Sequence, residues 1–219
     1  LVVPSTMMAR AVIDEWRKGE GSRRCRRGGQ AGQRHPLAVL LDDADGVAEH
    51  RLQGRSQGGI GGGAGTAGEI GHTTLDEYGE LCRCGNRGSL ETVASARRVT
   101  AMLAPVVGEE LTISEVVRRA EDGSRACERL LTDVGLQVGR SLADLCSLLN
   151  PQMILVGGEL AQASALLIPA IERVIGRCGV PAAAESVHIK PGALGARTHV
   201  LGTIALARRE AGAAAVFNS

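Results

Sequence analysis

The pattern of apolar and polar positions predicts well-formed helices in the second half of the chain. Apolar residues recur at helical spacing over residues 90–103 and over residues 124–149, where the stripe continues for many turns. Between these segments, Thr112 and Glu115 have the spacing of a capping box, which predicts a short helix that ends near Gly123. The local signals in this half of the sequence therefore agree with one another.

Two predicted strands alternate with these and further helices. Residues 153–156 (MILV) form a short, fully apolar run between Pro151 and a Gly-Gly pair, which is typical of a buried parallel strand. Residues 186–190 alternate like a second strand, and helices are expected over about 161–177 and 199–210. The order helix, strand, helix, strand, helix predicts an α/β domain with a mixed sheet and flanking helices.

The first 66 residues lack this regularity. Residues 16–34 hold seven basic residues against a single glutamate, without helical spacing, which favours a solvated linker over a phosphate or nucleic-acid contact. One plausible strand lies at 37–41, whereas residues 58–71 contain eight glycines and offer little to bury. We expect residues 1–66 to be poorly ordered and residues 67–219 to form the domain.

Composition narrows the range of partners. The 219-residue chain has a formal net charge of +1 and only three aromatic residues. A balanced charge gives no general attraction to nucleic acid or anionic lipid, and scarce aromatics leave few surfaces on which bases could stack. We therefore expect no direct nucleic-acid contact by this chain, and a core built from small aliphatic side chains.

The six cysteines are too few and too scattered for the disulfide framework of a secreted protein. Cys127, Cys146 and Cys178 fall in helical patterns, which predicts buried free thiols. No apolar run approaches the roughly 18 residues of a membrane span, and no secretory signal opens the chain. We expect a cytoplasmic protein without membrane contact.

The strongest chemical signal lies in residues 68–91. His72, Cys82 and Cys84 offer one imidazole and two thiolates, which are good zinc ligands, and the Cys-x-Cys spacing suits a tight metal-binding turn. A closed structural site needs four ligands, and Ser89, the nearest candidate for the fourth, is a poor zinc ligand. From the residues alone, a weakened or water-completed zinc site and a site with no metal both remain open.

Glycines suggest a second, weaker site. Gly157 and Gly158 follow the predicted buried strand, where glycine lets a ligand or the backbone approach closely. A plain turn from strand to helix explains such a pair equally well. The earlier glycine run lacks a Walker lysine and the strand-loop-helix context of a phosphate-binding loop.

The segments GEIGH (68–72) and CRCGNRGSLE (82–91) together resemble the signature of the ROK family, with Ser89 in place of its third cysteine. This family contains bacterial repressors, open-reading-frame proteins and sugar kinases. The resemblance continues through ILVGGEL (154–160) and residues 191–207. It implies the actin-like ATPase (ribonuclease H-like) fold, with residues 67–219 as the C-terminal sugar- and zinc-binding lobe. The N-terminal lobe would be missing or degenerate, and residues 1–66 a remnant of the region between the lobes.

The resemblance also implies roles for single residues. Glu69 and Glu91 would hydrogen-bond the hydroxyls of a hexose or amino-hexose, and His72 would bind zinc with one ring nitrogen and face the sugar with the other. Cys82 and Cys84 would complete the zinc ligands that are present, with affinity weakened by the serine. Adenine-side contacts of ATP would fall near Gly157 and Gly158, and a homodimer is expected.

Departures from the family pattern argue against kinase activity. Thr6 occupies the position of the family's catalytic aspartate, and a threonine hydroxyl does not act as a general base near neutral pH. The phosphate loop D-x-G-G-T is not found either, so ATP and Mg²⁺ are expected only if the chain is a kinase. Compensating frameshifts or natural divergence would each explain residues 21–66.

Three hypotheses follow. The chain is the sugar-sensing module of a ROK-type transcriptional regulator without its DNA-binding domain. Alternatively, it is a truncated, inactive glucokinase-like sugar kinase, or a degenerate product without ligand function. The missing catalytic aspartate favours the first.

Overall fold

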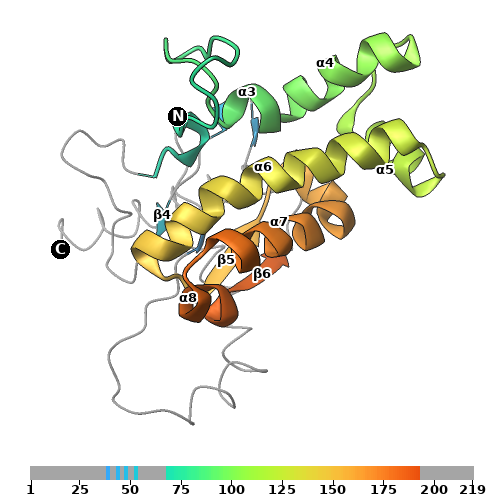
Figure 1. The fold of residues 1–219 in the computed structure, drawn as a ribbon. Coiled ribbons are helices and arrows are strands. Elements are labelled where there is room, and N and C mark those ends of the chain that lie inside the picture. The colour runs from blue at the N-terminus through green and yellow to red at the C-terminus, as the bar shows by residue number, and fades with distance from the viewer. Residues whose placement is uncertain (1–37, 40–42, 45–46, 49–51, 54–67, 193–219) are drawn as a thin grey trace, which may run out of the picture.

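A computed structural model describes part of the chain, drawn as coloured elements in Figure 1. The described residues are 38–39, 43–44, 47–48, 52–53 and 68–192. Thr6, the glycine run up to residue 67 and the helix predicted at 199–210 lie outside them.

A pair of long helices forms the centre of the described region. Helix α6 (Arg125–Leu149) and helix α7 (Ser164–Cys178) lie side by side along most of their length (Figure 1). Two glycines of α6 permit this close approach. A β-carbon at Gly135 would lie 2.8 Å from the β-carbon of Ala170, and one at Gly139 would lie 2.8 Å from that of Val174. At these two glycines the backbone of α6 therefore packs directly against α7.

The buried parallel strand predicted at residues 153–156 is present. Strand β5 (Met153–Val156) is entirely buried and pairs in parallel with strand β6 (His188–Pro191). The crossover connection between these parallel strands consists of the 3-10 helix η2 (Glu159–Ala163), α7 and a short helix α8 (Pro181–Ser186). Helix α8 was not predicted, and the strand starts two residues later than expected because Ser186 belongs to that helix.

The predicted helix at 90–103 is wrong as a single element. The structure has a short helix α3 (Glu91–Ala94) and a separate helix α4 (Ala96–Val107). Ser95 separates them because its backbone is extended, and its side chain accepts a hydrogen bond from the backbone N–H of Arg98, which caps α4.

The two other predicted helix boundaries are confirmed. Helix α5 (Ile113–Glu121) opens with the complete capping box of Thr112 and Glu115. Helix α6 ends at Asn150, which adopts a left-handed conformation with φ 44° before the proline.

Four strands of two residues each are described before residue 68. Strand β1 (Ala38–Val39) pairs antiparallel with β4 (Leu52–Gln53) and lies beside β5, and β2 (Asp43–Ala44) pairs antiparallel with β3 (Val47–Ala48). Strand β1 falls within the run predicted as a strand at residues 37–41.

The core consists of small aliphatic side chains, as the composition predicts. Leu131, Leu142, Ile154 and Ile171 are among its fully buried members. Cys127 and Cys146 are also fully buried, but the prediction for Cys178 is wrong, since this thiol is exposed in the last turn of α7. No helix in the part of the chain that the structure describes combines the length and apolar character of a membrane span.

Candidate functional site

The predicted site lies in an irregular loop that joins the 3-10 helix η1 (Ile70–His72) to helix α3. Two isolated β-bridges close the loop, one between Thr74 and Ser89 and one between Leu81 and Arg87. Gly88, which lies between Arg87 and Ser89 of the two bridges, must be glycine. Its φ is 58°, and a β-carbon there would lie 1.6 Å from the carbonyl oxygen of Asp76. The chain therefore folds back tightly with the cysteines at its tip.

The loop is fixed to the core at both of its ends. Thr73 shares a hydrogen bond of 2.9 Å with the buried hydroxyl of Ser141 on α6, and the backbone N–H of Leu90 donates to the carbonyl of Thr73 at 2.9 Å. Leu90 is fully buried in the hydrophobic core, and Ile70 is buried beside it. These contacts anchor η1 and the start of α3 next to each other.

The predicted metal ligands are brought together. One ligand atom each from His72, Cys82 and Cys84 lies within 4.8 Å of the other two. The Cys82 sulfur is 3.6 Å from His72 Nδ1, and the backbone N–H of Gly85 donates to the carbonyl of Cys82 in the tight turn between the thiols. An imidazole and two thiols at these separations fit a zinc ion, with thiolate and imidazole donors of the kind zinc prefers.

Glu91 enters the same cluster from the first turn of α3. Its side chain is buried, and its Oε2 atom lies 3.4 Å from His72 Nδ1 and 3.9 Å from the Cys82 sulfur. Its other oxygen, Oε1, pairs with the Nε of Arg83 at 2.9 Å. Arg83, the residue between the two cysteines, was not predicted from the sequence as a partner of Glu91. Only its position inside the Cys-x-Cys turn could have indicated this ion pair.

The surroundings of Cys82 favour the thiolate that binds metal. Burial and the nearby Glu91 carboxylate raise the pKa of the thiol, but the Cys84 backbone and thiol and the Ser89 hydroxyl more than offset this and hold the pKa below its usual value. The Ser89 hydroxyl is fully buried and lacks a hydrogen bond of good geometry among the described residues. The Ser89 hydroxyl thus acts on Cys82 and belongs to the surroundings of the same cluster.

Glu69 takes a different position from Glu91. It is half-buried and precedes η1, the element that ends at His72. Its carboxylate forms no ion pair or hydrogen bond with the side chains that the structure describes, so it is available to a ligand. His72, Cys82, Cys84 and Glu91 thus form one cluster, with Glu69 one short helical turn away in sequence.

Gly157 and Gly158 are both buried directly after β5. Gly158 has φ 74° and ψ −167°, a conformation open to glycine alone, and starts η2. The backbone N–H of Gly192 donates to Val156 at 2.7 Å, and a β-carbon at Gly192 would lie 3.5 Å from the Gly157 α-carbon. The turn itself accounts for Gly158, and the contact of both glycines with a nucleotide stays a prediction.

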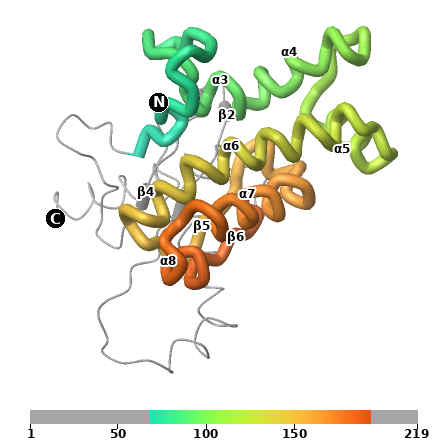
Figure 2. Tube along the Cα trace, viewed as in Figure 1, coloured from blue at the N-terminus to red at the C-terminus, as the bar shows by residue number. Residues whose placement is uncertain are grey.

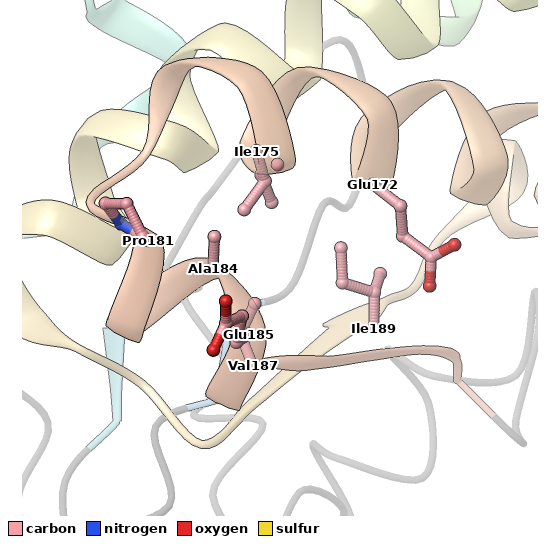
Figure 3. A pocket seen from close by; sticks show the side chains of 8 residues that line it. Glu172, Ile175, Pro181, Ala184, Glu185, Val187 and Ile189 are labelled. Carbon is pink, nitrogen blue, oxygen red and sulfur yellow. The ribbon is translucent and has the colours of Figure 1, made fainter.

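A pocket of about 300 Å³ lies elsewhere, between α7, α8 and β6 (Figure 3). Its lining consists of Glu172, Ile175, Gly176, Pro181, Ala184, Glu185, Val187 and Ile189. Two carboxylates and no basic side chain line it, which disfavours phosphate groups. Figure 2 shows helix α8 well separated from the loop that carries the cysteines, so the two sites are distinct.

The sequence profile of the ROK family matches residues 56–210, which is more than half of the chain. The chain belongs to the ROK family. It is 36% identical over 131 residues to the DNA-binding transcriptional repressor Mlc of Escherichia coli, covering 56% of this chain and 32% of Mlc. It is 31% identical over 158 residues to the xylose repressor of Caldicellulosiruptor bescii, covering 66% of this chain and 40% of that protein. A glucokinase of Halalkalibacterium halodurans is 29% identical over 153 residues, covering 63% of this chain and 46% of the enzyme. The chain thus spans less than half of each of these relatives.

Solved structures of the family share the fold. A ROK family transcriptional regulator homologous to E. coli Mlc superposes with a TM-score of 0.66 and 23% identity, over 86% of this chain and 46% of that one. A ROK glucokinase from Streptomyces griseus, solved with glucose and AMPPNP, gives a TM-score of 0.67 and 22% identity, over 95% and 68%. The expected α/β, actin-like ATPase fold is therefore confirmed.

Proposed function

We propose that this ROK chain is the sugar-sensing module of a transcriptional regulator. The observation that carries the proposal is the buried Glu91 carboxylate, held beside His72 at the start of α3 with Glu69 nearby in the chain. The relatives support the regulatory role, since Mlc and the xylose repressor are named as repressors and are more similar to this chain than the glucokinase is.

Sugar hydroxyls suit this arrangement. Each carboxylate accepts two hydroxyl donors, and a sugar analogue that lacks a hydroxyl leaves a buried acceptor unpaired. Arg83 holds one oxygen of Glu91, so the orientation of the carboxylate is set before a ligand arrives. The substrate class is a hexose or amino-hexose, in keeping with relatives named for N-acetylglucosamine and as a glucokinase; another relative is named for the pentose xylose, which is therefore tested beside them.

A structural zinc ion fits the His72, Cys82 and Cys84 donors. When bound, it would cross-link the loop and so fix the positions of η1, which Glu69 precedes, and of the first turn of α3, which carries Glu91. The residues of the chain bind and orient the sugar, and no chemical step on the sugar is assigned to them.

The kinase reading is the second candidate, and the similarity to glucokinases supports it. The regulator reading expects no ATP-dependent phosphorylation of glucose, N-acetylglucosamine or xylose by this chain. Sugar phosphate formed above the level of a Glu69→Gln control would establish the kinase instead.

Calorimetric titration of the purified chain with glucose, N-acetylglucosamine and xylose tests the sensing role. We expect one of these sugars to bind and Glu69→Gln to remove most of the heat, because a hydroxyl loses its charged acceptor. Glu77→Gln, an exposed change in the same loop, serves as the matched control and should bind like the parent chain. A folded parent chain that gives no heat with any of the three sugars refutes the proposal.

Two further properties belong to this proposal. We infer a cytoplasmic protein that forms a homodimer. Light scattering coupled to gel filtration measures the mass, and a single copy at all concentrations tested would contradict the dimer.

A further inference from the structure

The distances around His72 match the edges of a zinc-centred tetrahedron. With zinc bonds of about 2.0–2.1 Å to nitrogen or oxygen and about 2.3 Å to sulfur, tetrahedral angles put nitrogen and oxygen about 3.4 Å apart and sulfur about 3.6 Å from either. The structure has 3.4 Å between His72 Nδ1 and Glu91 Oε2, 3.6 Å between His72 Nδ1 and Cys82 Sγ, and 3.9 Å between Cys82 Sγ and Glu91 Oε2. These three atoms therefore already form one face of such a site.

Because residue 89 is a serine, the fourth ligand position of the zinc site is open to Glu91. A neutral hydroxyl binds zinc far less well than a thiolate or a carboxylate. Ser89 is fully buried next to Cys82, and its hydroxyl carries no charge that it could bring to the metal. Glu91 is charged, buried and within reach.

Arg83 orients the carboxylate for this role. Its ion pair at 2.9 Å engages Oε1 and leaves Oε2 directed to the cluster, which is the arrangement by which outer partners of a metal site orient a monodentate carboxylate ligand. The exposed Cys84 supplies the remaining donor, and its ligand atom lies within 4.8 Å of those of His72 and Cys82. Glu91 is not part of the group that meets this limit, so the Cys84 side chain must turn toward the carboxylate when all four bind one ion.

We propose that Glu91 Oε2 is the fourth zinc ligand in this chain, completing a His72, Cys82, Cys84, Glu91 set in place of the missing third cysteine. A consequence, which rests on the proposed sugar-sensing function, is that zinc and sugar use the same carboxylate. Zinc binding and sugar binding then oppose each other in this chain, and a cysteine at position 89 releases Glu91 from the metal.

Zinc binding without any sugar tests the ligand assignment. Zinc affinity is measured on the full chain by competition with a chromophoric chelator, and the ligand shell by X-ray absorption. We expect a shell of two sulfur and two nitrogen or oxygen atoms in the parent chain. Glu91→Gln should weaken zinc binding by at least the roughly 10- to 100-fold that loss of an outer partner of a metal ligand costs. Glu77→Gln should leave the affinity unchanged.

Substitutions at Ser89 separate this proposal from its alternatives. Ser89→Ala should keep most of the zinc affinity of the parent chain, because the hydroxyl acts on Cys82 and is not itself a ligand. Ser89→Cys should bind more tightly with three sulfurs in the shell, and in that background Glu91→Gln should cost little. A loss of affinity in Ser89→Ala as large as that in Glu91→Gln, parent-like affinity in Glu91→Gln, or an equal cost of Glu91→Gln in both backgrounds would each overturn the assignment. Circular dichroism of the Ser89→Cys/Glu91→Gln chain shows whether loss of the carboxylate alone prevents folding.

A sugar titration at saturating zinc tests the consequence. We expect zinc to lower the sugar affinity of the parent chain and to leave that of Ser89→Cys unchanged or raised. Equal effects of zinc on both chains would refute the competition while leaving the ligand assignment intact. An absence of sugar binding in either chain, with or without zinc, would refute the proposed function instead.

Discussion

The contact between α6 and α7 gives the sharpest test of the fold. Gly135 and Gly139 lie four residues apart on the face of α6 that meets α7. Replacing both by alanine adds two methyl groups at positions where the nearest β-carbon is 2.8 Å away in each case. Backbone atoms of Leu167 and Ile171 lie within 3.2 Å of the added carbons, so rotation of a side chain cannot relieve the overlap.

The magnitude follows from the separation that the helices need. Methyl groups pack at about 3.5–4.0 Å, so α6 and α7 must move apart by roughly 0.7 Å, which forfeits a quarter to a half of the dispersion energy of the atom pairs affected. Overpacking of this kind costs about 1–3 kcal/mol per site. Alanine regains about 1 kcal/mol per site from its higher helix propensity. We expect the double variant to lose about 2 kcal/mol of the free energy of unfolding.

Urea denaturation followed by circular dichroism measures this loss. With a slope of about 1–3 kcal/mol per molar urea, the midpoint should fall by roughly 1 M at unchanged slope. Gly176→Ala is the matched control, because Gly176 lies in α7 and a β-carbon there has no neighbour within 4 Å. It should gain about 0.5–1 kcal/mol from propensity alone. A Gly135→Ala/Gly139→Ala chain as stable as the parent would refute the close packing of α6 against α7.

Other residues allow shorter tests. The backbone and side chain of Thr112 hold the pKa of Glu115 below its usual value. The stability advantage of the parent chain over Glu115→Gln should therefore be present above about pH 4.5 and disappear as the pH falls further. A stability advantage that stays constant from neutral pH to pH 3 would contradict this. Burial raises the pKa of Cys146 to about 11, so about a thousandth of it is ionised at pH 8, and mass spectrometry after brief alkylation should find Cys84 modified and Cys146 intact. Gly88→Ala should speed tryptic cleavage of the loop, because the new methyl group overlaps the Asp76 carbonyl; cleavage at the parent rate would show that the loop adapts.

Elements with a long, regular pattern were predicted well from the sequence. Helix α6 repeats its apolar stripe over 25 residues, and β5 is a four-residue apolar run bounded by Pro151 before it and Gly157 after it. The break at Ser95 was missed because the apolar spacing continues across it, and the competing signal is a single serine that caps the following helix. Helix α8 was missed because its six residues give too little periodicity to stand out from a loop.

The candidate site was predictable to the extent that its chemistry depends on local spacing. His72, Cys82 and Cys84 are brought together by one closed loop, so their grouping follows from the motif. The pairing of Arg83 with Glu91 depends on the direction in which the Cys-x-Cys turn presents its middle residue. That direction is set by the folded turn and by the burial of the start of α3, which no pattern in the sequence encodes.

The loop that carries the site has little apolar core of its own, and this ties its order to the metal. Its buried apolar side chains are those at its ends, Ile70 and Leu90, together with Cys82 at the tip. Between them the backbone is closed by two isolated bridges and by glycines. Ordering such a segment costs about 1–2 kcal/mol per residue, which so few buried side chains offset only in part. Metal binding supplies cross-links where side-chain burial does not, so removal of zinc should loosen residues 73–90 while leaving α6 and α7 packed. Hydrogen exchange with and without a chelator measures this directly, and equal protection of the loop in both states would show that its own hydrogen bonds suffice.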